Sequence, residues 1–287
     1  MIASLRQLKS RIRSIENVKK VTHAMEMISL SKVKPMQNRL LDGRRYFRET
    51  EKLLKHLLAT ADGASHPLTE DRPHKDKTAL CLVTSDTGLC SSYNHSILDE
   101  AEEFIHKYGP GNIILEAVGR KGLNYFKKRG VKVAHSHIEL NSRYSDGLAR
   151  GILKNLTELF LSREVDEVYL AYTRFESPSR HKPVIEKLFN IEWDRTDKKS
   201  ANELYIFEPG LDAILDQLIP LCLFNKIKSM LLESFVSEHS ARMIAMGEAT
   251  HNARELLEGL VLMRNKVRQA NITREIMEII SSAEVLR

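Results

Sequence analysis

The feature that most constrains this 287-residue chain is its C-terminal stretch, which contains no proline from Leu221 to Arg287. Only Gly247 and Gly259 interrupt a continuous helical pattern there. At about 1.5 Å rise per residue, one helix of this extent would be on the order of 100 Å long. Such a helix is too long for its own domain to cover, so the sequence predicts that it pairs with another helix.

The apolar residues of this stretch recur mostly three or four positions apart, which is the pattern of a coiled-coil seam. We place the seam at Ala241, Ala245, Ala249, Ala253, Leu256, Leu260, Met263, Val267, Ala270 and Met277. The first part of this seam is alanine, whose small side chain lets a partner backbone approach closely. The larger residues further on would hold the partner at an ordinary coiled-coil distance.

A candidate partner helix lies at the other end of the chain. Its apolar stripe is formed by Leu5, Leu8, Ile12, Ile15, Val18, Thr22, Met25 and Ile28. Between residues 1 and 40 nine basic residues stand against two acidic ones, so the face away from the stripe is strongly positive. Pro35 should kink or interrupt this helix, because proline lacks a backbone donor and clashes with the preceding turn. We expect the two terminal helices to pair antiparallel.

Between these helices, from Thr78 onward, short β-rich runs alternate with amphipathic helical runs. Alternation of this kind indicates a mainly parallel sheet with helices on its faces. The predicted fold class is a Rossmann-like α/β insert domain plus a long antiparallel two-helix coiled coil. The domain limits we expect are 1–60 for the N-terminal coiled-coil helix, 61–77 for a linker, 78–195 for the α/β domain, 196–210 for a connector and 211–287 for the C-terminal coiled-coil helix.

Residues 86–88, Asp-Thr-Gly, form the tripeptide that carries the catalytic aspartate of aspartic proteases. Those enzymes need two carboxylates that share a proton, whereas here a single copy follows a strand of an α/β pattern. We therefore interpret the tripeptide as a strand-to-helix turn. In this turn Gly88 would adopt a backbone conformation that strains other residues, and Asp86, Ser91 or Ser92 would cap the helix that begins near Tyr93.

Other signals for nucleotide or metal binding are weak. The chain lacks the glycine-rich motifs G-x-G-x-x-G and G-x-x-x-x-G-K-[ST], which bring backbone amides close to a phosphate. We interpret the basic turn at 119–122 as the start of a helix rather than as an anion site. His135 and His137 would share one face of a strand as a surface pair, but no third ligand is nearby. The sequence therefore predicts no metal and no cofactor.

The net charge of +6 favours an acidic partner, which could be nucleic acid, an anionic lipid surface or an acidic protein. The first 45 residues contain no aromatic side chain, which weakens the nucleic-acid reading. A basic coiled-coil protein that binds nucleic acid nevertheless stays open as the alternative. No run of about 18 uncharged apolar residues occurs, so the sequence predicts no direct membrane span.

The two ends of the chain together resemble one family, the γ subunit of F-type ATP synthases of the bacterial type. The resemblance is carried by RIRSIENVKKVTHAMEMISLSKV near the N-terminus and by SEHSARMIAMGEATHNA and NKVRQANITREIMEIISSA near the C-terminus. The SDTGLCSSYN turn and the YIFEP segment match in position, although the turn has Thr87 and Ser91 where the family usually has a basic residue and a glycine. Because the matching helix starts close to Met1, we expect no presequence.

The resemblance implies a central-stalk rotor that performs no covalent chemistry by itself. Such a rotor couples ion flow through a membrane ring to ATP synthesis or hydrolysis at the catalytic β subunits. The implied partners are the ring of three α and three β subunits (α3β3), the ε subunit and the c-ring, with no nucleic acid. The implied location is peripheral, at the cytoplasmic face of the bacterial plasma membrane.

The resemblance also implies site residues, none of which is catalytic. Coupling contacts to the α and β subunits would involve Met25, Arg242, Gln269, Thr273 and Glu275, although Met25 could equally be a seam residue. A basic face toward acidic β loops would consist of Arg11, Arg13, Lys19 and Lys20. A bearing at the tip would use Ile276, Ile279, Ile280 and Leu286. Contacts to the c-ring and the ε subunit would involve Tyr205 and Glu208.

Overall fold

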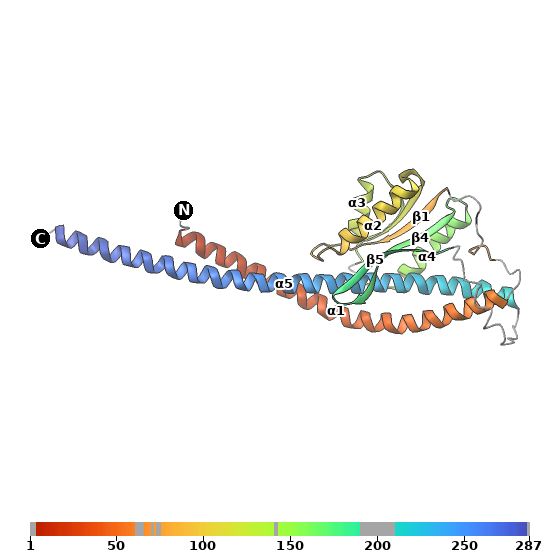
Figure 1. Ribbon diagram of the computed structural model, residues 1–287, viewed down its shortest axis with the longest axis horizontal. Coiled ribbons are helices and arrows are strands. Elements are labelled where there is room, and N and C mark those ends of the chain that lie inside the picture. Colours follow the sequence, from red (N-terminus) through yellow and green to blue (C-terminus); the bar gives the residue numbers. More distant parts are fainter. Residues whose placement is uncertain are drawn as a thin grey trace. The chain divides into compact units, whose positions relative to one another are not determined.

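The computed structural model describes residues 4–60, 66–69, 72, 76–140, 143–189 and 210–285 (Figure 1). The elements in chain order are α1 (Leu5–Thr60), β1 (Thr78–Val83), α2 (Tyr93–Tyr108), η1 (Pro110–Asn112), β2 (Ile113–Val118), α3 (Arg120–Lys127), β3 (Lys132–His137), α4 (Asp146–Leu161), β4 (Glu167–Ser177), β5 (Arg180–Lys187) and α5 (Leu211–Val285). The chain divides into two compact units, residues 1–30 with 242–287 and residues 31–241. Both long helices contribute to both units, so the domain limits expected from the sequence stay predictions.

The larger unit contains a five-stranded sheet with the order β3-β2-β1-β4-β5. The first four strands are parallel, and β5 pairs antiparallel with β4 at the edge. Every residue of β1 and β2 is buried, as expected for strands that are covered on both faces. The predicted α/β fold with a mainly parallel sheet is thus confirmed.

Helices cover both faces of this sheet (Figure 1). One apolar cluster joins α2 and α3 to the sheet, with Leu80, Ile97 and Phe126 among its members. A second cluster on the other face joins the sheet to α4, to the end of α1 and to the start of α5, for example through Leu54 and Phe235. The sheet is therefore packed directly against both long helices within this unit.

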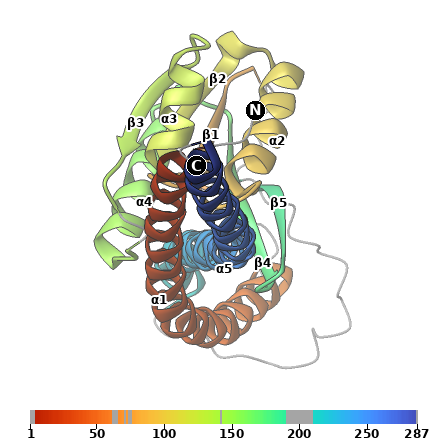
Figure 2. The same cartoon turned by 90° about the vertical axis from the view of Figure 1, so that its left-hand side faces the viewer.

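The smaller unit is a pair of antiparallel helices, formed by the start of α1 and the end of α5 (Figure 2). Thr250 Oγ1 donates to Thr22 Oγ1 at 2.8 Å, and both side chains are buried. Glu26 Oε1 lies 3.3 Å from the point where a Cβ on Gly247 would stand. Because Thr22 faces Thr250 and Glu26 faces Gly247, the two helices run in opposite directions. The predicted antiparallel coiled coil is confirmed.

The coiled-coil seam differs from the predicted apolar stripe. On α1, buried or half-buried side chains recur at alternating intervals of three and four from Leu5 to Leu57. This series passes through five polar residues, Lys19, Thr22, Glu26, Ser29 and Thr50. Val18 and Ile28, which were predicted in the seam, are 46% and 57% exposed. The prediction followed polarity, whereas the buried face of the helix follows one geometric repeat that includes polar side chains such as Thr22, which accepts a hydrogen bond from Thr250.

The seam of α5 differs from the prediction in the same way. Its buried and half-buried series runs through Met246, Thr250, Ala253, Leu257, Leu260, Arg264 and Val267. The predicted seam residues Ala253, Leu260 and Val267 belong to this series, but Leu256 is 57% exposed and its neighbour Leu257 is buried. Met263, Ala270 and Met277 are exposed as well. The polar Thr250 continues the repeat because Thr22 accepts its hydrogen bond.

Of the kink or interruption expected at Pro35, the interruption is wrong, because α1 is helical on both sides of this residue. A bend of the helix at this position stays a prediction. Proline in a helix costs about 3 kcal/mol, because one backbone hydrogen bond is lost and the ring crowds the preceding turn. Pro35 itself is exposed, while the nearby seam residues Val33 and Leu40 are 6% and 1% exposed. Burying each such side chain contributes about 1.5–3 kcal/mol, which offsets the cost. Pro220 also lies inside a helix, α5, where it is half-buried.

Candidate functional site

The Asp-Thr-Gly turn after β1 caps a helix and is not arranged for catalysis. The backbone N–H groups of residues 120–122 donate to Asp86 Oδ1, to the Ser85 carbonyl and to Thr84 Oγ1, at 3.1, 3.1 and 2.9 Å. These N–H groups belong to the first turn of α3. Such groups bind an anion when nothing else accepts their hydrogen bonds. The carboxylate of Asp86 already occupies that place, so the basic turn at 119–122 starts a helix, as predicted.

The details of this turn correct two expectations. Asp86 caps α3 rather than α2, and Ser92 at the start of α2 makes no side-chain capping bond. The left-handed backbone conformations fall at Leu89 and Ser91, with φ of 62° and 52°, and not at Gly88. The physical reason is that β1 and β2 are parallel neighbours, so the turn after β1 lies beside the helix that follows β2.

One of the two paired histidines is not a simple surface residue. His137 Nε2 lies 2.9 Å from Glu116 Oε1, and Asn155 Nδ2 donates to the same oxygen at 3.0 Å. Glu116 is only 1% exposed, so His137 is a partner of a buried carboxylate. His135 is exposed. Within the described parts of the chain, no group of three or more His, Cys, Asp or Glu side chains could hold a metal ion.

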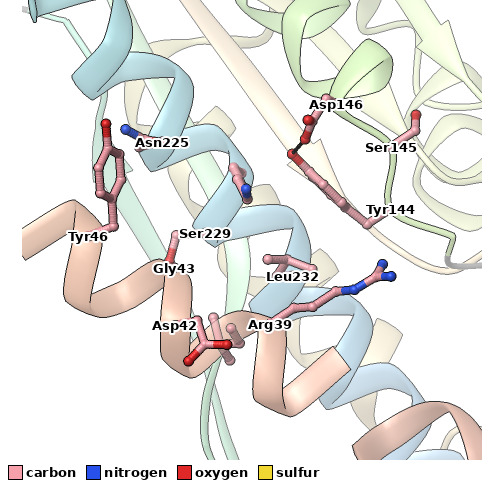
Figure 3. Close-up of a pocket in the computed structure, with 12 residues that line it drawn as sticks. Arg39, Asp42, Gly43, Tyr46, Tyr144, Ser145, Asp146, Asn225, Ser229 and Leu232 are labelled. Carbon is pink, nitrogen blue, oxygen red and sulfur yellow. Dashed lines mark hydrogen bonds between the residues drawn. The ribbon is translucent and has the colours of Figure 1, made fainter. Parts of the chain in front are cut away.

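A cavity of about 570 Å³ lies in the larger unit, between α1, α5 and the start of α4 (Figure 3). Its lining residues are Arg39, Leu40, Asp42, Gly43, Tyr46, Tyr144, Ser145, Asp146, Asn225, Lys228, Ser229 and Leu232. Tyr144 reaches toward Asp146 and donates to its Oδ1 at 2.5 Å (Figure 3). Two acidic and two basic side chains balance each other in this lining, so it does not select a ligand of one charge.

The residues expected to couple the chain to other subunits all belong to the smaller unit. Met25 is half-buried beside the seam of α1, and Arg242 on α5 is only 5% exposed. Gln269, Thr273 and Glu275 are exposed, as is every described side chain from 268 to 283. The structure therefore separates the half-buried Met25 of α1 and the buried Arg242 of α5 from an exposed group nearer the C-terminal end of α5.

The other predicted surfaces fall partly on described residues. Arg11, Arg13 and Lys20 are exposed, but Lys19 is half-buried at a seam position and so leaves the basic face. The tip residues Ile276, Ile279 and Ile280 are 50%, 68% and 53% exposed. Leu286, Tyr205 and Glu208 lie outside the described residues.

The sequence of this chain is similar to the sequences of known proteins along its whole length. A protein-family model described as ATP synthase matches residues 4–286. The ATP synthase gamma chain of Heliobacterium modesticaldum is 36% identical, over 98% of this chain and 99% of that protein. The gamma chain of Moorella thermoacetica is also 36% identical, over the full length of both chains. The chain belongs to the ATP synthase gamma chain family. It is therefore a non-catalytic subunit of an ATP synthase.

Solved structures share the fold of this gamma chain family member. A rotor chain of the Euglena gracilis mitochondrial ATP synthase has a TM-score of 0.66 and 16% identity, covering 93% of this chain and 98% of that one. A chain from the central stalk and c-ring of the Tetrahymena thermophila mitochondrial enzyme has a TM-score of 0.60 and 23% identity, covering 80% and 99%. Among the described residues, no helix is both long and apolar enough to cross a membrane.

Sequence reasoning missed one polar network in the larger unit. Arg44 on α1 and Glu233 on α5 form an ion pair at 3.0 Å, and both also bond to the backbone of β4. The available signal was Glu233 itself, because a carboxylate within the apolar run MLLESFV needs a partner when it is buried. The identity of that partner, 189 positions away, could not be read from the pattern.

Proposed function

We propose that this chain is the rotating shaft of the complex, and that it couples ion flow through a membrane ring to ATP synthesis or hydrolysis. The partners would be a ring of three α and three β subunits around the coiled coil, with the ε subunit and the c-ring at the other end. The observation that carries the proposal is the end of α5, whose described side chains from 268 to 283 are all exposed. Among them are apolar residues that a surrounding protein would cover, Ile272, Ile276, Met277, Ile279 and Ile280.

A shaft of this kind acts by contacting each catalytic subunit differently at each angle of rotation. A difference of about 1.4 kcal/mol in contact free energy changes a nucleotide-binding equilibrium about tenfold. Coupling between binding equilibria is reciprocal, so rotation can drive synthesis and hydrolysis can drive rotation. The apolar tip would suit a bearing, because apolar contacts have little directional preference.

Specific contacts follow from the family resemblance. Coupling contacts would involve the five residues named from the sequence, with Arg242 and Gln269 as the polar candidates. Contacts to the c-ring and the ε subunit would involve Tyr205 and Glu208. The complex would place this chain at the cytoplasmic face of a bacterial plasma membrane, without a span of its own.

Co-purification tests the proposal. The native protein is expected to purify with α, β and ε subunits and with ATPase activity. Purification without these subunits and without that activity would contradict the proposal. The alternative of nucleic-acid binding predicts instead an affinity for DNA or RNA that falls steeply with salt. The family matches give that alternative no support.

The basic face supplies a second prediction. Reversing Arg11, Arg13 and Lys20 to glutamate should lower the ions pumped per ATP about tenfold, because three contacts to acidic loops would become repulsive. The measurement is ATP-driven ion uptake by vesicles that contain the assembled complex. A matched control reverses three exposed lysines of the α/β region, Lys127, Lys128 and Lys132. Unchanged pumping in the first variant would contradict the role of the basic face.

A further inference from the structure

The strand β4 continues beyond the end of its neighbour β1. The two strands pair only as far as Ala171 of β4, while β4 itself runs to Ser177. The Val168 carbonyl accepts from the Leu188 N–H on the β5 side. Because backbone groups alternate between the two edges of a strand, the odd-numbered residues present theirs on the β1 side. Thr173 and Phe175 therefore have edge groups that β1 cannot pair.

Side chains of α5 pair these groups instead. Ser234 Oγ accepts from the Thr173 N–H at 3.2 Å, and Ser237 Oγ donates to the Thr173 carbonyl at 3.4 Å. Glu233 Oε2 accepts from the Phe175 N–H at 3.2 Å. All three α5 residues are buried, so these bonds are shielded from water. Along this edge, side chains of a helix take the place of a missing strand.

The helix α1 joins the same network through Arg44. Its Nη2 donates to the Phe175 carbonyl at 2.7 Å, and its Nε donates to Glu233 Oε1 at 3.1 Å. The side chains of Arg44 and Glu233 are 26% and 8% exposed. One backbone position of β4 is thus bonded to α1 through its carbonyl and to α5 through its N–H.

The network lies where α/β folds of this type usually bind a ligand. The strand order changes direction between β1 and β4, and the crevice at the carboxyl ends of such strands is the usual binding place. Here α5 occupies that place, since every residue from Met230 to Ala241 is buried. Ala241 of α5 also packs against Cys90 and Tyr93, which follow β1. The crevice therefore holds part of the same chain.

We propose that this network is the joint through which torque passes between the α/β region and the two long helices. The inference rests on the proposed function, in which the ring and the catalytic subunits act on different parts of the chain. Apolar packing between the sheet and the helices has little directionality, whereas buried hydrogen bonds fix orientation. Glu233, Ser234, Ser237 and Arg44 fix the rotational position of both helices against β4.

The test uses the complete complex in vesicles and compares ions pumped per ATP hydrolysed. Glu233→Gln keeps the shape of the side chain but removes the charge, and Ser234→Ala with Ser237→Ala removes both bonds to Thr173. The matched control is Glu167→Gln, because the Lys187–Glu167 pair lies within the sheet and its side chains are 25% and 4% exposed. We expect the pumping ratio to fall at least about threefold in both joint variants and to stay unchanged in the control.

A second measurement separates a joint from a site that only stabilises the fold. A bead attached to the α/β region at an exposed position, for instance after His95→Cys, fluctuates in angle while the complex is paused. The variance of that angle should rise in the joint variants, because a looser joint is more compliant.

Equal pumping and variance in variants and wild type would overturn the proposal, and so would an equal loss in the Glu167 control. If Glu233→Gln does not assemble, the double serine variant decides. A wild-type chain that does not assemble or pump contradicts the proposed function rather than the joint.

Discussion

Replacing Arg44 by alanine is expected to lower the free energy of unfolding of the full chain by about 3 kcal/mol at pH 8, because one partner of a buried ion pair is lost. The remaining carboxylate of Glu233 is 8% exposed and would keep the Phe175 N–H and Ser229 Oγ as hydrogen-bond donors. Urea unfolding of wild type and variant measures the difference. The matched control is Arg129→Ala, since the Arg129–Glu102 pair is 44% and 32% exposed and such pairs contribute about 1 kcal/mol or less.

The loss in free energy of unfolding caused by Arg44→Ala should be smaller at low pH. Burial raises the pKa of Glu233 above its ordinary value of 4.5, while Arg44 opposes this rise. A raised carboxyl pKa means that the native state keeps a proton that the unfolded state loses. The contribution of this proton to the free energy of unfolding is therefore complete below the pKa that Glu233 has in the unfolded state. It is lost as the pH rises through the pKa that Glu233 has in the native state. Without Arg44 the native pKa rises further, so the deficit at pH 5 should be smaller than at pH 8. Equal deficits at both pH values would contradict this account.

Replacing Gly119 by alanine is expected to cost more than 3 kcal/mol in the free energy of unfolding. The residue has φ of 93°, in a region that side chains rarely adopt, and this strain alone costs about 1–3 kcal/mol. A Cβ there would also stand 2.2 Å from the Thr84 carbonyl oxygen. Both the end of β1 and the start of α3 would have to shift to relieve that contact.

Gly109 offers a matched control for this substitution. Its φ of 87° is nearly the same, but an added Cβ would meet only Asn112 Nδ2, at 3.5 Å. Gly109→Ala should therefore report the backbone strain alone, with a loss of about 1–3 kcal/mol. The difference between the two variants, measured by urea unfolding, isolates the contact with Thr84. Losses of equal size would show that the contact is relieved at no cost.

The periodicity of the sequence predicted the elements but not the seam of the coiled coil. Apolar spacing identified a long terminal helix at each end, because a helix repeat is a local property of the chain. The same spacing placed Val18, Ile28 and Leu256 in the seam, where the structure leaves them exposed. Thr22 and Thr250 occupy seam positions because the Thr250 hydroxyl donates a hydrogen bond to the Thr22 hydroxyl, and a local pattern cannot reveal a pairing across 228 positions.

The functional features also divide into those that sequence order predicted and those that depended on tertiary contacts. The family was recognisable from terminal segments whose residues stand in a fixed order along the chain. The capping of α3 by Asp86 depended on which strands became neighbours, and sequence order suggested α2 instead. The network of Arg44, Glu233 and β4 depended on three segments that meet only after folding.

By itself, the sequence determined the two long helices, the alternating strands and helices between them, and the membership of the gamma chain family. These follow from the 3.6-residue and two-residue periods of local structure and from ordered motifs. Only the tertiary structure decided which polar side chains lie in the seam and how α5 fills the crevice beside β4. Burial makes an unpaired polar group costly, so each such choice depends on a partner that folding brings from a distant part of the chain.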